Sequence, residues 1–174
     1  MVRRAGLAQV AIIACAAVLS PGPAGAAAKE GDRPVPLGSK LEELITAKIT
    51  VGDLQRSYDF YTGLVGLKPT DPELAEAGLK STADFIEIGL NPSGSRRDPA
   101  LMLIRRRGDV PDKASAQRTW IAFKTPDVAA AVARIKAAGF DVRNEATPYE
   151  DLTFGIVHDP DGYTVEFLAE RPAK

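Results

Sequence analysis

The chain has 174 residues, enough for one ordinary domain; 45% of them are hydrophobic and 26% are charged. Its formal net charge of −1 argues against nucleic acid as a partner, because affinity for nucleic acid comes mostly from basic patches that face phosphates. The only cysteine is Cys15, which excludes an intramolecular disulfide framework.

The first 26 residues have the layout of a bacterial secretory signal peptide. Arg3 and Arg4 form a short basic start, residues 5–19 are apolar and uncharged, and residues 20–23 (Ser-Pro-Gly-Pro) would end a helix. Residues 24–26 (Ala-Gly-Ala) form a small-x-small cleavage site. The apolar run is too short and too rich in alanine to make a convincing membrane span. The sequence therefore predicts a periplasmic or secreted protein.

A lipoprotein is the alternative, because residues 12–15 (Ile-Ile-Ala-Cys) loosely resemble a lipoprotein box and a lipidated Cys15 would hold the mature protein at a membrane. Cleavage after Ala26 instead removes Cys15 and leaves 20 basic against 23 acidic residues, a net charge of −3. Residues 27–40, which include Pro34 and Pro36, are predicted to form a tether. The domain would then occupy residues 41–171.

Residues 41–171 contain a repeat with an offset of 74 residues, measured from Asp53 to Asp127. Each copy opens with a strand of alternating pattern, over 46–52 and 120–126, and the aspartate can cap the helix that follows. The helices are expected over 54–64 and 128–138, and each ends at a glycine suited to a C-terminal cap.

Three strands follow each predicted helix. In the first copy they are expected over about 67–70, 83–90 and 100–105, with a hairpin at residues 91–95 (Asn-Pro-Ser-Gly-Ser). In the second copy they are expected over about 141–145, 152–158 and 163–168. Residues 159–162 (Asp-Pro-Asp-Gly) form the last turn, where glycine supplies the positive φ angle. The sequence thus predicts two tandem βαβββ modules, over about 41–107 and 118–171.

The motifs of both copies resemble those of the vicinal-oxygen-chelate superfamily of glyoxalases, extradiol dioxygenases, epimerases and bleomycin-resistance proteins. The resemblance rests on residues 53–61 with 64–67, on 120–123 with 127–131 and 136–139, and on the hairpin at 159–167. It implies an α+β fold, the glyoxalase/bleomycin resistance/dioxygenase fold, in which the two sheets curl around a shared cavity with helices outside. Many relatives form dimers, so the resemblance also allows a homodimer.

Family members hold a metal at four positions, and this chain has Thr46, Trp120, about Met102 and Glu166 at the matching places. A mononuclear site needs three or four protein donors, and one carboxylate with Thr, Trp and Met does not supply them. The only histidine, His158, lies in the strand that pairs with the strand of Glu166, but a third ligand is lacking. We therefore expect no metal and no other cofactor.

Strand alternation indicates which side chains share a face of each sheet. One face of each opening strand carries polar or aromatic side chains, and by the resemblance this face lines the cavity. The candidate substrate-binding residues are Thr46, Lys48, Met102, Trp120 and Lys124. The residues expected to face the helices are Ile49, Val51, Ile121, Phe123, Val165 and Phe167.

The candidate catalytic residues are Glu166 and His158. Burial beside Trp120 would raise the pKa of the Glu166 carboxyl, whereas Lys48 or Lys124 beside it would lower that pKa. The alternative role for Glu166 is a salt bridge to one of these lysines, and the alternative for His158 is a satisfied surface group. Asp159 and Asp161 are expected only to form the turn.

Five arginines cluster around the first hairpin: Arg96, Arg97, Arg105, Arg106 and Arg107. They could attract a carboxylate or phosphate, but we prefer the interpretation that they protect a solvated edge strand.

Two functions remain open at this point. The first is metal-independent binding of a small organic molecule followed by a lyase, isomerase or epimerase step, with Glu166 as acid or base. The second is binding or sequestration without catalysis, as in the bleomycin-resistance branch. The missing ligands oppose a metal-dependent glyoxalase or dioxygenase.

Overall fold

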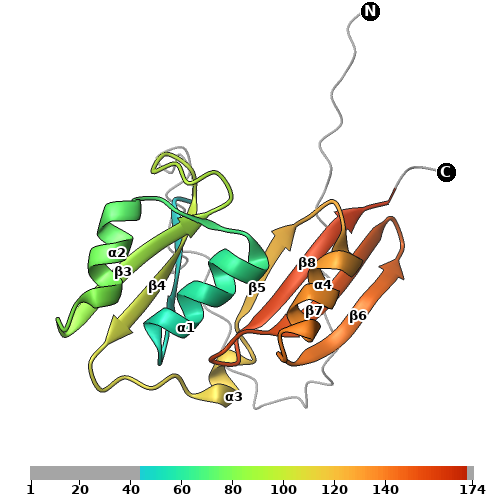
Figure 1. The fold of residues 1–174 in the computed structure, drawn as a ribbon. Helices are drawn as coiled ribbons and strands as arrows, with labels where there is room; N and C mark the ends of the chain where they lie inside the picture. The colour runs from blue at the N-terminus through green and yellow to red at the C-terminus, as the bar shows by residue number, and fades with distance from the viewer. Residues whose placement is uncertain (1–43, 172–174) are drawn as a thin grey trace, which may run out of the picture. The chain divides into compact units, whose positions relative to one another are not determined.

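The structure is a computed structural model that describes residues 44–171. The predicted signal peptide (1–26) and tether (27–40) lie outside the described residues. The described part has two successive βαβββ units (Figure 1). The first contains β1 (Thr46–Thr50), α1 (Leu54–Asp59), η3 (Phe60–Val65), β2 (Lys68–Pro69), α2 (Pro72–Lys80), β3 (Phe85–Asn91) and β4 (Ala100–Arg106). The short helix α3 (Lys113–Ala116) leads to β5 (Trp120–Lys124), α4 (Val128–Ala137), β6 (Val142–Tyr149), β7 (Leu152–His158) and β8 (Thr164–Glu170).

Each unit builds one mixed four-stranded sheet, and the two sheets have the same strand order. The orders are β1-β4-β3-β2 and β5-β8-β7-β6, with the opening strand parallel to its neighbour and the other pairs antiparallel. This topology confirms the fold class that the sequence predicts. It also corrects one expectation, because β4, which carries Arg105 and Arg106, lies between β1 and β3 and is not an edge strand.

The helix boundaries follow from local chemistry that the sequence makes visible. Asp53 accepts a hydrogen bond from the backbone N–H of Arg56 at 3.0 Å, and Asp127 accepts one from Ala130 at 2.9 Å. Gly66 and Gly139 adopt φ angles of 95° and 83° after the helices, a region that glycine enters at little cost. The final turn of α1 widens into the π-helix η3.

The helix α2 is absent from the sequence-based prediction. Asp71 caps it by accepting from the backbone N–H of Leu74 at 3.0 Å, and Pro72 occupies its first turn. Only Ala75 of this helix is buried, so its apolar stripe is too narrow to give a clear helical period. No helix among residues 44–171 is long and apolar enough to cross a bilayer.

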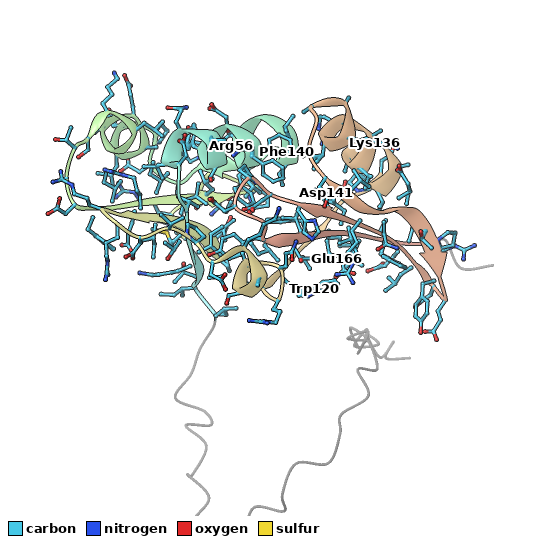
Figure 2. The ribbon with its side chains drawn as sticks, turned by 90° about the horizontal axis from the view of Figure 1, so that it is seen from below. Arg56, Trp120, Lys136, Phe140, Asp141 and Glu166 are labelled. Atoms are coloured by element: carbon cyan, nitrogen blue, oxygen red, sulfur yellow. The ribbon has the colours of Figure 1, made fainter. Side chains whose placement is uncertain are left out.

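The core lies between the sheets and the helices. Ile49, Val51, Val165 and Phe167 are buried in it, and Ile121 and Phe123 pack against it partly buried, which confirms the predicted faces. The opposite face of each sheet carries the candidate site residues. Arg56 of α1 and Lys136 of α4 lie on the helical side in Figure 2, while Trp120 and Glu166 lie on the other side.

The turn at 159–162 also joins the two modules, a role that the sequence did not reveal. The Tyr61 hydroxyl donates to Asp159 Oδ2 at 2.9 Å, and Asp161 accepts from Gly52 N and Ser57 Oγ at 3.1 and 3.0 Å. The Tyr163 hydroxyl donates to the carbonyl of Thr50 at 2.9 Å. Asp159 and Asp161 therefore hold the first module to the second in addition to shaping their turn.

Candidate functional site

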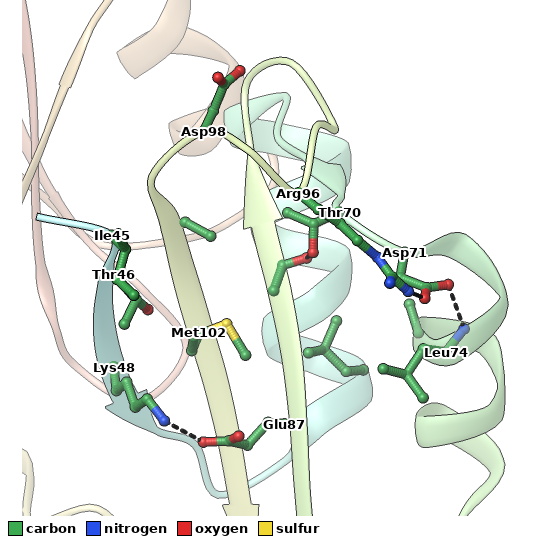
Figure 3. Close-up of a pocket in the computed structure, with 14 residues that line it drawn as sticks. Ile45, Thr46, Lys48, Thr70, Asp71, Leu74, Glu87, Arg96, Asp98 and Met102 are labelled. Carbon is green, nitrogen blue, oxygen red and sulfur yellow. Dashed lines mark hydrogen bonds and ion pairs between the residues drawn. The ribbon is translucent and has the colours of Figure 1, made fainter. Parts of the chain in front are cut away.

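A cleft of about 430 Å³ lies against the open face of the first sheet and is flanked by α2 (Figure 3). Thr46 and Lys48 of β1 stand on one side of it, Leu74 of α2 on the other, and Met102 between them. Gly89 completes its floor, because a Cβ there would lie 2.7 Å from Thr70 Oγ1 and 3.0 Å from Met102 Sδ. The cleft is lined by the first module alone, whereas the resemblance implied a cavity shared by both modules.

Two ion pairs border the cleft. Lys48 Nζ lies 2.7 Å from Glu87 Oε1, and Arg96 of the β3–β4 hairpin pairs with Asp71. Asp71 also caps α2, so the same carboxylate fixes the start of the helix and the position of Arg96. The cleft therefore has an apolar middle with a cation and an anion on two sides.

Two of the other clustered arginines are held by residues at 81–84. Arg107 pairs with Asp84 at 2.9 Å, and Arg105 donates to the carbonyls of Ser81 and Ala83 at 3.2 and 2.9 Å. Of the five clustered arginines, Arg96 alone lines the cleft.

The second group of candidate residues lies on the open face of the second sheet. Trp120 is opposite Thr164 in the β5–β8 register, and Glu166 is opposite Ala122 on β5 and Ile156 on β7. Trp120 is 48% exposed, whereas Thr164 is fully buried and donates to the carbonyl of Gln117 at 2.8 Å. Trp120 therefore forms an exposed aromatic surface beside a half-buried carboxyl group.

Burial raises the pKa of the Glu166 carboxyl above its usual range. Neither lysine that was expected beside it makes the predicted salt bridge. Lys48 pairs with Glu87, and Lys124 pairs with Glu170 at 2.5 Å at the far end of β5. A carboxyl group whose pKa is raised by burial and which has no lysine partner is a candidate for proton transfer.

His158 lies on the same sheet face, at the end of β7. Its Nδ1 atom lies 2.6 Å from Asp141 Oδ2, and its side chain is 13% exposed. It is thus a largely covered histidine whose Nδ1 atom has a carboxylate partner, an arrangement that fits both the predicted catalytic role and the alternative of a satisfied group.

The strand register settles which first-module residue matches Glu166. Met102 is opposite Lys48, two residues after Thr46, just as Glu166 is opposite Ala122, two residues after Trp120. The positions that the resemblance assigns to a metal are then Thr46, Met102, Trp120 and Glu166, and a site with one carboxylate lacks the three or four donors that a divalent metal needs. Within residues 44–171 no group of three or more His, Cys, Asp or Glu side chains is placed to hold a metal ion.

The structure brings the predicted residues together in two separate groups. Thr46, Lys48 and Met102 line the cleft of the first module, while Trp120, Glu166 and His158 share the open face of the second sheet. Lys124 lies on the same open face as Trp120 but at the far end of β5, where it pairs with Glu170. The cleft residues that the sequence did not single out include Asp71, Leu74 and Glu87, while Arg96 was considered only as one of five clustered arginines. The sequence Asp71-Pro72, an N-cap followed by proline, is a signal that could have found α2.

Two βαβββ modules with open sheet faces and outer helices define the architecture of the vicinal-oxygen-chelate proteins. The family model described as the Glyoxalase/Bleomycin resistance protein/Dioxygenase superfamily matches residues 43–167, and the chain belongs to this superfamily.

Relatives within the superfamily differ in function. Lactoylglutathione lyase of Escherichia coli O157:H7 is 31% identical over 136 residues, which are 75% of this chain and 94% of that protein. Among solved structures, the trypanothione-dependent glyoxalase I of Leishmania major is 26% identical with a TM-score of 0.60, covering 75% of this chain and 88% of that one. An antibiotic-binding protein from Streptomyces sp. CB03234 has a TM-score of 0.57 at 19% identity, covering 75% and 97%, a likeness that shows the fold alone.

Proposed function

We propose that this protein binds a small organic molecule in the cleft of the first module, without a metal ion in the family position. The observation that carries the proposal is the cleft of about 430 Å³, which falls within the size range of small-molecule sites. It is apolar at Met102 in the middle and at Leu74 on the α2 side, and two ion pairs border it. Such a lining suits a ligand with an apolar body and polar ends.

A panel of ligands tests this proposal on the full chain. The melting temperature is measured with small organic acids, aromatic compounds, aldehydes and divalent metals, because a ligand at 100 times its dissociation constant stabilises a protein by about 2.7 kcal/mol. Leu74→Lys places a charge in the cleft wall, and Ala77→Lys places the same charge on an exposed position of the same helix. We expect an organic ligand to stabilise the wild type and Ala77→Lys but not Leu74→Lys. Stabilisation by metals alone would contradict the proposal.

A second candidate function is proton transfer by Glu166 in a lyase, isomerase or epimerase step. The observation that favours it is the raised pKa of Glu166, which burial causes and which neither Lys48 nor Lys124 offsets. This chemistry would take place at the open face of the second sheet, beside Trp120. A purely sequestering protein would need the cleft but no such group.

Deuterium incorporation separates catalysis from simple binding. Candidate carbonyl compounds are incubated with the protein in D2O, and exchange of their acidic C–H protons is followed by NMR. We expect exchange with the wild type, loss of exchange with Glu166→Gln, and retention with Glu170→Gln, a matched change on the same strand. Ligand binding without exchange in the wild type would assign the protein to the sequestering class.

We also propose, from the leader-like first 26 residues, that the mature protein is exported. Mass spectrometry of the protein from its native cell envelope would show an N-terminus at residue 27, or a lipidated Cys15 if the lipoprotein alternative holds.

A further inference from the structure

We infer that Asp141 and His158 form a base dyad on the open face of the second sheet, with Nε2 of His158 as the proton-accepting atom. The inference rests on the proposed proton transfer at Glu166, and it adds to that site a second proton-transfer group and the residue that positions it. Neither Asp141 nor Arg143, which completes the site, belongs to the positions that the family uses for its metal.

Two contacts fix the geometry of the dyad. Asp141 Oδ2 lies 2.6 Å from His158 Nδ1, and the backbone N–H of His158 donates to the carbonyl of Asp141 at 2.9 Å. A carboxylate can only accept, so in neutral His158 it holds the proton on Nδ1 and leaves the lone pair on Nε2. Asp141 is therefore a positioning residue, and Nε2 is the atom that can take a proton.

The strand register places the dyad beside Glu166. His158 is opposite Thr164, and Thr164 is opposite Trp120, so these three form one row across β7, β8 and β5. Glu166 is diagonal to His158 in the antiparallel β7–β8 pair, where such neighbours lie about 7–8 Å apart. Ile156, which is opposite Glu166 and two residues before His158 on β7, is 6% exposed yet lies outside the main core cluster. This face therefore has a covered patch of its own.

Arg143 and Trp120 form the cover. The Arg143 Cζ atom lies 6.0 Å from the centre of the Trp120 ring, although β6 and β5 are the two outer strands of the sheet. Their side chains therefore meet above β7 and β8, where His158 is left 13% exposed. Arg143 makes no ion pair with any residue of the described range 44–171. Its charge is available to an anionic oxygen of a ligand.

The arrangement suits a small carbonyl compound with an acidic C–H bond. The C–H proton would pass to His158 Nε2, and the electron pair of that bond would pass to the carbonyl oxygen, which Arg143 stabilises. Asp141 would balance the charge of the imidazolium ring. Glu166 in its protonated form would return a proton to carbon, and His158 would then lose its proton to solvent while Glu166 regains one.

The state of the ring can be measured directly, because His158 is the only histidine of the chain. Nitrogen NMR of the 15N-labelled full chain, without ligand, reports which ring nitrogen carries the proton above the imidazole titration. We expect the Nδ1–H tautomer in the wild type, a shift toward the Nε2–H tautomer in Asp141→Ala, and recovery in Asp141→Glu. Asp151→Ala, at an exposed carboxylate in the turn between β6 and β7, should leave the tautomer unchanged. An Nε2–H tautomer in the wild type, or no change in Asp141→Ala, would overturn the dyad.

Chemical modification tests the cover over the ring. Diethyl pyrocarbonate modifies unprotonated imidazole nitrogen, and mass spectrometry follows the single His158 peptide. We expect modification to be several-fold faster in Trp120→Ala than in the wild type, and unchanged in Tyr149→Ala, an exposed aromatic residue of the same module. An unchanged rate of His158 modification in Trp120→Ala would show that Trp120 does not cover the ring. Because neither measurement uses a substrate, an absence of deuterium exchange would count against the proposed catalysis while leaving the dyad standing.

Discussion

Among single residues, Asp159 shows how a turn residue acquires a structural role that its sequence motif hides. Its Oδ1 atom accepts from the backbone N–H groups of Asp161 and Tyr163 at 2.9 and 2.8 Å, and its Oδ2 atom accepts from Tyr61. Burial raises its pKa to about 6, although these three hydrogen bonds act in the opposite direction. Asp159 is only 4% exposed, so the ionisation of its carboxyl group is coupled to folding.

The sign of this coupling is fixed by the two pKa values, about 6 in the folded chain and 3.8 for an unburied aspartate. The folded state binds the Asp159 proton more tightly than the unfolded state does. This proton therefore adds its full contribution to the free energy of unfolding below pH 4, and the contribution disappears as pH rises through 6. The decrease in the free energy of unfolding is about 3 kcal/mol. Asp159→Asn cannot ionise and keeps an oxygen for the two backbone donors.

We therefore expect Asp159→Asn to gain stability relative to the wild type between pH 4 and pH 7. Urea unfolding at several pH values measures the difference in free energy of unfolding between the variant and the wild type. The contributions of all other carboxylates are the same in both proteins and cancel in this difference. Asp151→Asn, at an exposed position, serves as the control and should run parallel to the wild type. A constant difference between Asp159→Asn and the wild type across this range would show that Asp159 keeps an ordinary pKa.

Among the elements, α2 decides the shape of the cleft. It supplies Leu74 and Ala75 to the lining, and its cap Asp71 holds Arg96 of the hairpin.

The strands, the helices α1 and α4 and the sheet faces could be predicted from the sequence, because hydrophobic periodicity, capping residues and glycines are local signals. The cleft could not, because it depends on a weakly amphipathic helix and on a hairpin that approaches it in space. Alternation likewise placed Lys48 and Lys124 on the open faces but could not show that Glu87 and Glu170 would pair with them.

The dual role of Asp71 gives a prediction for this element. Asp71→Ala removes the N-cap of α2, which costs about 1 kcal/mol of stability, and also releases Arg96 from its partner. The matched control is Asp127→Ala, which removes the corresponding cap of α4 far from the cleft. We expect both variants to lose similar stability in urea unfolding, and only Asp71→Ala to weaken binding of a cleft ligand in titration calorimetry. Equal binding by both variants would show that Asp71 does not shape the cleft.

Across the whole described unit, a shared core and a set of contacts between the two modules, called the seam, join two copies that the sequence presents as a simple repeat. Phe60 of η3 packs edge-on against Phe140 after α4, with ring centres 4.9 Å apart, and Arg134 Nε donates to the carbonyl of Leu64 at 2.7 Å. Buried residues of both modules belong to a single cluster. The offset of 74 residues predicted the modules but not this seam, since residues such as Phe140 lie beside the repeat motifs and not in them.

The continuous core predicts that the two modules unfold together. In calorimetry of the full chain, we expect the described domain to give one transition whose calorimetric and van't Hoff enthalpies agree.

Phe140→Ala removes an aromatic contact across the seam. Because Phe140 is only partly buried, we expect the free energy of unfolding to fall by about 3 kcal/mol, near the lower end of the range for aromatic truncation. The loss should broaden or split the transition, because the seam is weakened while each module keeps its own sheet. Phe154→Ala, a partly buried phenylalanine within the second sheet, should lower the melting temperature without splitting the transition. Two transitions in the wild type would show that the modules are energetically independent, despite their hydrogen bonds through Asp159 and Asp161.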